Sequence, residues 1–484
     1  MAAKKTRKTT KARTAKKKSA AKLAASNVFL INMIPKALSG ETHQDSEPHL
    51  TVNLSNTKQI VGTAFTPDPA LGPNAPLYVS QDGGNSWMLN SIVPSTAGSS
   101  LGTGDITTSF NSNASRLYGG ILRSGSGKME FLRTSSFSSP SAMAVLKSRS
   151  NADQPFTTAT TLGGKDRVYI GSNDFSAPGG RTATIDQSMD GGLSAPTFKT
   201  IRVEKRSTVG QNGPQTRPIF HADGTMYAAF YRWRTSTGDF QANTFVVTSA
   251  DVIVVRDDNS GNSPQPYTAL VDAGDGLAGK RVVTGKRFPF MIHGTGATGQ
   301  QRIGGCLSIA VSPVNSSIVF LVWGDKPAGS TDFLTLHVTR SLDRGVSWSA
   351  DLLTIPSATN GAIALNSVGK IAFLYQKLKN FRWVTHVQRS IDGATWDDLI
   401  LADTSATNPI KTFDPYLGDY CHLLATGKDF CGIFSAGNTP NLANFPNGVK
   451  YQRNANFATQ RLLKLDGVTP VPASVDPFFF RITE

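Results

Sequence analysis

The chain has 484 residues, 45 glycines, 26 prolines and a formal net charge of +15. Residues 1–22 hold ten Lys or Arg and no acid, and subtracting those ten from +15 leaves +5 for the remainder. No apolar run is long enough to span a membrane. The three cysteines, Cys306, Cys421 and Cys431, show neither disulfide-framework nor zinc-ligand spacing, so we expect them to be small buried residues.

Residues 1–26 are rich in Lys, Ala, Thr and Ser, and they are predicted to form a disordered basic tail. Such a tail binds nucleic acid or another polyanion by releasing counterions, or it only keeps the chain soluble. The segment Leu23–Ile34 is the one candidate for a signal-peptide core, but Asn27 and Asn32 interrupt it. We therefore expect a chain that is cytoplasmic or exported by a route other than general secretion.

A short turn pattern recurs along the rest of the chain. Ser80–Trp87 reads Ser-x-Asp-x-Gly-x-Ser-Trp, and Ser341–Trp348 repeats it in full. Ser390–Trp396 is one residue shorter, and Ser188–Ser194 lacks the tryptophan. In a β-hairpin, the aspartate of this pattern accepts hydrogen bonds from the turn, and the glycine adopts a positive φ.

These turns resemble the Asp-box, or BNR, repeat of sialidase-like β-propellers. The resemblance implies an all-β fold built from radial blades. It also implies that four aspartates lie on outer hairpins, away from the axial channel, and act structurally: Asp82, Asp190, Asp343 and Asp392.

A longer repeat underlies the turns. From residue 49 onward, a strand leads to a Gly/Asn/Asp turn, and an apolar strand with small residues returns. Seven returning strands have matching positions at Ile60, Leu117, Val168, Met226, Ile318, Ile371 and Phe430. Successive positions are 51 to 59 residues apart, except for a 92-residue gap that we assign to an insertion around 251–301. Each unit is long enough for four strands.

The sequence thus predicts an all-β protein, a single β-propeller of six or seven four-stranded blades over residues 27–484. Seven is the number of repeats, and six is the number that the resemblance implies. Either Val28–Ile34 or the terminal Pro477–Ile482 could supply the strand that closes the ring.

Polar residues recur at the start of each predicted inner strand, where the blades converge on one mouth of the channel. The candidates for catalysis are Asp105, Asp153, Arg217, Arg302 and Tyr420. The candidates for ligand binding around the mouth are Asp45, Glu47, Gln154, Asp414 and Asp419. Converging carboxylates beside arginine can carry acid/base chemistry, bind a cation or hold a sugar, or they can merely bridge the blades.

The resemblance implies sharper roles. Sialidase-like glycoside hydrolases use an arginine cluster, an aspartate acid/base and a tyrosine nucleophile assisted by a glutamate. Here Asp105 or Asp153 would be the acid/base, with Arg217 orienting the sugar. However, Glu47 occupies the place of the family's first arginine, and its charge would repel a carboxylate sugar, which argues against sialic acid.

Two functions follow from these features. The first is a sialidase-like propeller that binds or hydrolyses glycans at the axial mouth, with a glycan or glycoconjugate as its partner. The alternative is a non-catalytic scaffold, adhesion or binding protein whose residues 1–26 contact nucleic acid or another polyanion. Whether the protein is an enzyme is open at this point. No cofactor and no metal ligand set is predicted, although a structural or mouth-bound Ca²⁺ is left open.

Overall fold

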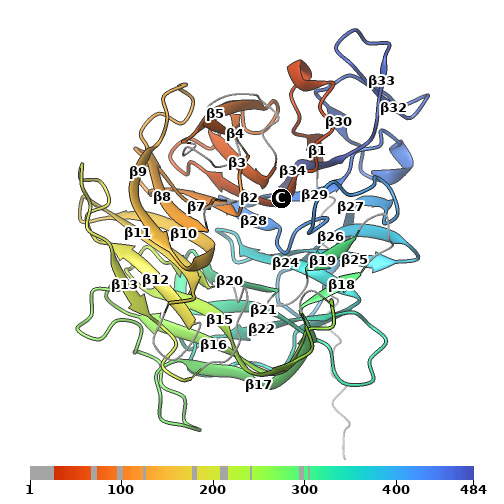
Figure 1. Ribbon diagram of the computed structural model, residues 1–484. Coiled ribbons are helices and arrows are strands. Elements are labelled where there is room, and N and C mark those ends of the chain that lie inside the picture. The colour runs from red at the N-terminus through yellow and green to blue at the C-terminus, as the bar shows by residue number, and fades with distance from the viewer. Residues whose placement is uncertain are drawn as a thin grey trace, which may run out of the picture.

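A computed structural model describes most of the chain, and seven sheets in it surround a common axis (Figure 1). The described residues are 27–66, 74–94, 102–123, 127–176, 182–207, 216–239, 242–293, 299–302 and 306–484. The predicted basic tail, residues 1–26, lies outside them. Within the described part of the chain, no helix has the length and apolar content needed to cross a membrane.

The first four blades are four-stranded antiparallel meanders. Blade 1 contains β2 (Ser46–Val52), β3 (Ile60–Phe65), β4 (Asn74–Ser80) and β5 (Met88–Pro94). Blade 2 contains β6 (Ile106–Phe110), β7 (Leu117–Leu122), β8 (Lys128–Thr134) and β9 (Ala144–Ser150). Blade 3 contains β10 (Ala152–Leu162), β11 (Lys165–Asp174), β12 (Thr182–Ser188) and β13 (Lys199–Arg202). Blade 4 contains β14 (Arg217–Phe220), β15 (Met226–Thr237), β16 (Val246–Asp257) and β17 (Lys280–Pro289).

Three further blades and two small sheets complete the fold. Blade 5 contains β20 (Leu307–Ser312), β21 (Asn315–Asp325), β22 (Thr335–Ser341) and β23 (Leu353–Pro356). Blade 6 contains β24 (Ala358–Leu365), β25 (Ile371–Lys379), β26 (Arg382–Ser390) and β27 (Asp397–Ser405). Blade 7 contains β28 (His422–Thr426), β29 (Asp429–Gly437), β34 (Val475–Thr483), β1 (Asn27–Asn32) and β30 (Lys450–Tyr451). The small sheets are β18 (Met291–His293) with β19 (Gln300–Arg302), and β31 (Ala455–Asn456) with β32 (Arg461–Leu463) and β33 (Pro470–Val471).

The first strands of the blades form the innermost layer. Each contacts the first strand of the next blade, in the closed order β2, β6, β10, β14, β20, β24, β28 and back to β2. Because the ring is closed, every blade has a neighbouring blade on each side. Closure matters because a sheet edge that faces solvent tends to pair with other chains. The predicted all-β propeller is therefore confirmed. The described residues form seven blades, of which six have the predicted four strands and blade 7 has five.

Blade 7 is built from both ends of the described chain. Strand β34 pairs antiparallel with β29 on one side and with β1 on the other. Both terminal segments that the sequence offered as alternatives therefore take part in closure. Four side chains of β34 are fully buried: Phe478, Phe479, Phe480 and Ile482. Their burial contributes about 1.5–3 kcal/mol each, so hydrophobic packing holds the two ends together.

Two chain segments depart from the repeat. The predicted insertion includes residues of two blade strands, at 251–257 and 280–289. Only the loop between them and the β18–β19 hairpin are additions to the four-stranded blade. A second addition, 438–473, separates β29 from β34 and carries β30 to β33 and the short 3-10 helix η2 (Leu442–Asn444). Another such helix, η1 (Lys36–Leu38), follows β1. The sequence repeat missed the second addition because the segment has no counterpart in other blades.

The recurring turns join third and fourth strands and are held by their own side chains. Ser80 Oγ donates to Asp82 Oδ1 at 2.9 Å, and the Ser86 backbone N–H donates to the same oxygen at 2.9 Å. The Trp87 indole N–H donates to the Gly84 carbonyl at 3.2 Å. The Asp343 turn has the same set of bonds. These bonds fix the local turn and show what the serine, aspartate and tryptophan of the pattern contribute to it.

Substituting Gly84 with alanine is expected to destabilise the protein by about 3 kcal/mol. Gly84 has φ +86°, and an added Cβ would lie 2.1 Å from the Phe479 ring of the closing strand. Gly427→Ala is the matched control, since Gly427 also has a positive φ (+61°) but open space around its Cβ position. Urea denaturation measures both variants, and equal losses in free energy of unfolding would show that the Phe479 contact is unimportant.

Candidate functional site

The innermost strands of three blades each contain a β-bulge at an equivalent position. A β-bulge follows Ser46 in blade 1, Asp153 in blade 3 and Thr359 in blade 6. The next residue, Glu47, Gln154 or Asn360, has a φ of 53°, 57° or 55° and a buried side chain. A proline or glycine then resumes the strand. Since positive φ is costly for residues other than glycine, three such residues at one level show that the surroundings impose this conformation.

Ionisable side chains from several blades meet at this level of the channel. We call the following group the mouth cluster: Glu47, Asp105, Asp153, Asp419, Arg217, Arg302 and Tyr420. Its four carboxylates interact electrostatically with Arg302, which lies on the β18–β19 hairpin. Gln154 Nε2 lies 3.4 Å from Asp419 Oδ2. The group thus combines residues of blades 1, 2, 3, 4 and 7 with one residue of the added hairpin.

Aromatic rings form one side of the mouth cluster. The Tyr420 hydroxyl lies 3.5 Å from Asp105 Oδ1. The Arg217 guanidinium sits 3.3 Å from the centre of the Phe156 ring and 5.4 Å from that of Tyr420. Stacking on an aromatic face offsets part of the cost of burying a guanidinium. The sequence analysis missed Phe156, although it follows Gln154-Pro155 as His49 follows Glu47-Pro48.

Burial and crowding change the acidity of the carboxyl groups. Burial, followed by the neighbouring Asp105 and Asp419 charges, raises the pKa of Glu47 well above its usual value. Burial also raises the pKa of Asp105 to about 7, with the charges of Asp153 and Asp419 adding to the rise. The interaction between the two carboxyl groups raises the pKa of Glu47 and lowers that of Asp105. Burial therefore favours the protonated form of Glu47, and Asp105, with a pKa of about 7, exchanges a proton readily near neutral pH.

The remaining groups of the mouth cluster are also shifted by burial. Burial raises the pKa of Tyr420 well above its usual value, and the nearby Asp105 and Glu47 charges add to this. Burial lowers the pKa of Arg217 to about 10, against the opposing effect of Asp419. Tyr420 is therefore a neutral phenol and Arg217 a cation at neutral pH.

A cavity of about 210 Å³ continues along the channel from Arg217. Hydroxyl groups of Thr51, Thr108, Thr157 and Ser308 are among its lining groups. The rings of His49 and His422 also line it, stacked with their centres 3.9 Å apart. Burial lowers the pKa of both rings, that of His422 to about 4, so both are neutral at neutral pH. Hydroxyl-bearing, imidazole and apolar side chains thus line the cavity beside Arg217.

Two predicted ligand-binding residues lie apart from the mouth cluster. Asp45 accepts a hydrogen bond from the Tyr78 hydroxyl at 2.9 Å, and its backbone N–H bonds to Val475 of blade 7. This pairing turns its side chain toward β34, which corrects its predicted place in the ring. Asp414 pairs with Lys411 at 2.5 Å and accepts from the Gln300 N–H at 3.0 Å, so it anchors the β18–β19 hairpin.

The comparisons with known proteins show likeness of fold. No protein-family profile matches the chain, and no curated protein matches it. A PL25 ulvan lyase, a polysaccharide lyase, has 10% identity and a TM-score of 0.48, covering 81% of this chain and 92% of its own. The phage phi92 endosialidase has 11% identity and a TM-score of 0.41, covering 95% and 70%. Prolyl oligopeptidase B from Galerina marginata has 12% identity and a TM-score of 0.43, covering 84% and 48%. The protein is thus similar in structure to β-propeller proteins, of which the lyase and the endosialidase are carbohydrate-active.

Proposed function

We propose that the mouth cluster binds a glycan and cleaves a glycosidic bond by acid/base and nucleophilic catalysis. The observation that carries the proposal is the Glu47–Asp105 pair beside the Tyr420 hydroxyl. The environment gives two adjacent carboxyl groups different acidities, which supplies a proton donor and a proton acceptor at the same pH. Glycoside cleavage requires such a pair.

Each residue has a defined part in the proposed reaction. The Tyr420 oxygen attacks the anomeric carbon while its proton passes to the Asp105 carboxylate. Glu47 donates its proton to the departing glycosidic oxygen as the carbon–oxygen bond breaks. Water then attacks the anomeric carbon and gives a proton to the Glu47 carboxylate, while the bond between that carbon and the Tyr420 oxygen breaks. Asp105 returns its proton to the released Tyr420 oxygen, which restores all three groups. Arg217 and Arg302 orient the oxygen atoms of the sugar.

The experiment is hydrolysis of a panel of fluorogenic glycosides, with sialosides and uronides included, by wild type and Tyr420→Phe. Turnover of one sugar class by wild type and a loss of about 100-fold or more in Tyr420→Phe would support the proposal. Circular dichroism of the variant establishes that the fold is retained. No turnover by folded wild-type protein on any sugar would reject it.

A non-catalytic propeller is the second candidate, and the burial of the mouth cluster favours it. Glu47 is 1% exposed and Asp105 is 4% exposed, so the pair is also placed to bridge blades 1 and 2. In this case the cluster holds the ring together, and binding would depend on other surfaces, including residues 1–26.

Removing residues 1–26 is expected to weaken binding to DNA or heparin, because ten of the fifteen net positive charges are lost. The truncated chain should elute from heparin at a lower salt concentration, and its affinity for DNA should depend less steeply on salt. A full-length variant with the ten basic residues changed to glutamine separates charge from length. Unchanged elution of the truncated chain would show that the tail is not the polyanion-binding element.

A further inference from the structure

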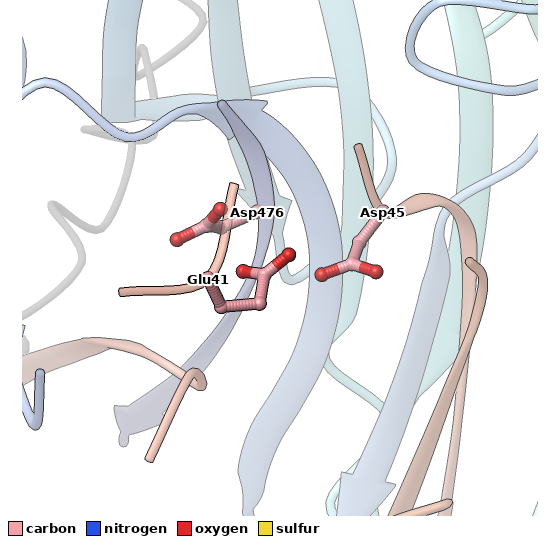
Figure 2. A group of neighbouring side chains, drawn as sticks. All are labelled: Glu41, Asp45 and Asp476. Atoms are coloured by element: carbon pink, nitrogen blue, oxygen red, sulfur yellow. The ribbon is translucent and has the colours of Figure 1, made fainter. Parts of the chain in front are cut away.

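Three acidic side chains gather where the two ends of the described chain meet (Figure 2). Glu41 and Asp45 lie between η1 and β2, and Asp476 lies in β34. One carboxylate oxygen of each lies within 4.8 Å of the corresponding oxygens of the other two. The three residues are 9%, 0% and 0% exposed. We call this group the closure cluster.

The positive charge around the closure cluster does not balance its negative charge. Arg453 Nη1 lies 3.1 Å from Asp476 Oδ2 and 3.7 Å from Glu41 Oε2. His43, on the other side, lies 3.5 Å from Glu41 Oε1, and its side chain is 45% exposed. Three carboxylates against one guanidinium leave a charge of −2 when all are ionised and His43 is neutral. A buried charge of this size needs two protons or one divalent cation to offset it.

Two oxygens of the closure cluster accept no hydrogen bond from the described residues. They are Asp45 Oδ1 and Glu41 Oε2, and both are buried. Their partner oxygens do: Asp45 Oδ2 accepts from the Tyr78 hydroxyl, and Glu41 Oε1 accepts from the His43 N–H. In Figure 2 the carboxyl groups of Glu41 and Asp45 are turned toward each other. Buried polar atoms nearly always take part in hydrogen bonds. Two carboxylate oxygens without one, of which Glu41 Oε2 has Arg453 Nη1 only at 3.7 Å, therefore indicate a missing cationic partner.

The third carboxylate is already fixed in place. Asp476 Oδ2 accepts from Asn32 Nδ2 at 2.7 Å, and Oδ1 accepts from the Ser474 hydroxyl at 2.7 Å. These bonds orient its oxygens from outside, as the surrounding residues of metal sites orient the ligands.

We propose that the closure cluster is a Ca²⁺ site, with Glu41, Asp45 and Asp476 as ligands. Every donor is an oxygen, and carboxylate oxygens are the ligands of hard divalent cations. One Ca²⁺ would neutralise the charge of −2 and satisfy both unpaired oxygens. Since the ligands come from opposite ends of the chain, the ion would join the segment before β2 to the last strand. Its role is structural, because the mouth cluster contains none of these residues.

The test measures Ca²⁺ binding and thermal unfolding on the full chain. Equilibrium dialysis against Ca²⁺ at neutral pH should give one ion per chain, and EDTA should lower the Tm by about 5 °C or more. Asp45→Asn should bind Ca²⁺ at least about 10-fold more weakly and lose the EDTA effect. Glu204→Gln is the matched control, since Glu204 is a fully buried acid outside the closure cluster, and it should keep both.

A second measurement keeps the proposal testable where Asp45→Asn does not fold. Tb³⁺ replaces Ca²⁺ at oxygen sites, and Tyr78, in contact with Asp45, would sensitise its luminescence. Wild type should show Tyr-sensitised emission that Ca²⁺ displaces, and Tyr78→Phe should lose most of it. A wild-type protein that binds no Ca²⁺ at about 10 mM and has the same Tm with and without EDTA would overturn the proposal, with protons then balancing the charge.

Discussion

Replacing Asp105 with asparagine is expected to lower kcat for glycoside cleavage by about 10² to 10⁴-fold, the usual contribution of one acid/base group. Asparagine keeps the shape of the side chain but cannot accept the proton of the Tyr420 hydroxyl, which lies 3.5 Å from Asp105 Oδ1. Steady-state kinetics on the best glycoside of the panel measures the loss. The fold should be retained, because an amide removes a buried negative charge from a crowded acidic group.

The pH profile distinguishes a catalytic Asp105 from a structural one. In wild type, kcat should rise with pH as Asp105 loses its proton near its pKa of about 7. Asp105→Asn should lack the rise. Glu204→Gln is the matched control, since Glu204 is a fully buried acid outside the mouth cluster. Full activity in Asp105→Asn would remove Asp105 from the mechanism, whatever its effect on stability.

The repeat in the sequence predicted the blades well because every blade buries equivalent residues. Positions such as Ile60, Met226 and Phe430 recur in the second strands β3, β15 and β29, and all three are buried. A periodic burial requirement leaves a periodic pattern in the sequence. The added segment 438–473 has no periodic requirement, and the sequence therefore contained no signal for it.

The candidate site could be predicted in part, because the inner strands of different blades start at equivalent positions. Glu47, Asp105, Asp153 and Asp419 stand at equivalent starts of inner strands, and the structure brings them together with both arginines. Asp45 is only two residues before Glu47, yet it faces the last blade. Local backbone geometry at a bulge decides such differences, and a single-residue change in register reverses a side chain's direction.

The closure cluster could not be predicted from the sequence. Glu41 and Asp476 belong to opposite ends of the chain, and neither lies in a repeated motif. Only the pairing of β34 with β1 and β29 brings them together. Ring closure therefore concentrates buried acids at two separate places, the mouth and the junction of the termini, and both should affect how stability depends on pH.

Between about pH 6.5 and 8, with EDTA present, the free energy of unfolding is expected to fall by at least about 2 kcal/mol. Burial raises the pKa of Asp45 to about 8 and that of Asp105 to about 7, whereas in the unfolded chain both lie near 3.8. In this window the unfolded chain has lost protons that the folded chain still binds, so rising pH favours unfolding, by about 1.36 kcal/mol per unit for each such group.

The lower limit of the window comes from the buried histidines. His422 has a pKa of about 4 when folded and 6.5 when unfolded, so rising pH increases stability up to about 6.5 and opposes the acids there. Urea denaturation at pH 6.5, 7.2 and 8.0 measures the slope, and Asp45→Asn should reduce it because the titrating group at the chain ends is gone. Added Ca²⁺ should flatten the wild-type slope in the same way, since a bound cation keeps Asp45 ionised in the folded protein. A wild-type slope of zero or of opposite sign in EDTA would show that these buried acids are already ionised in the folded protein, with their charge balanced by neighbouring cations.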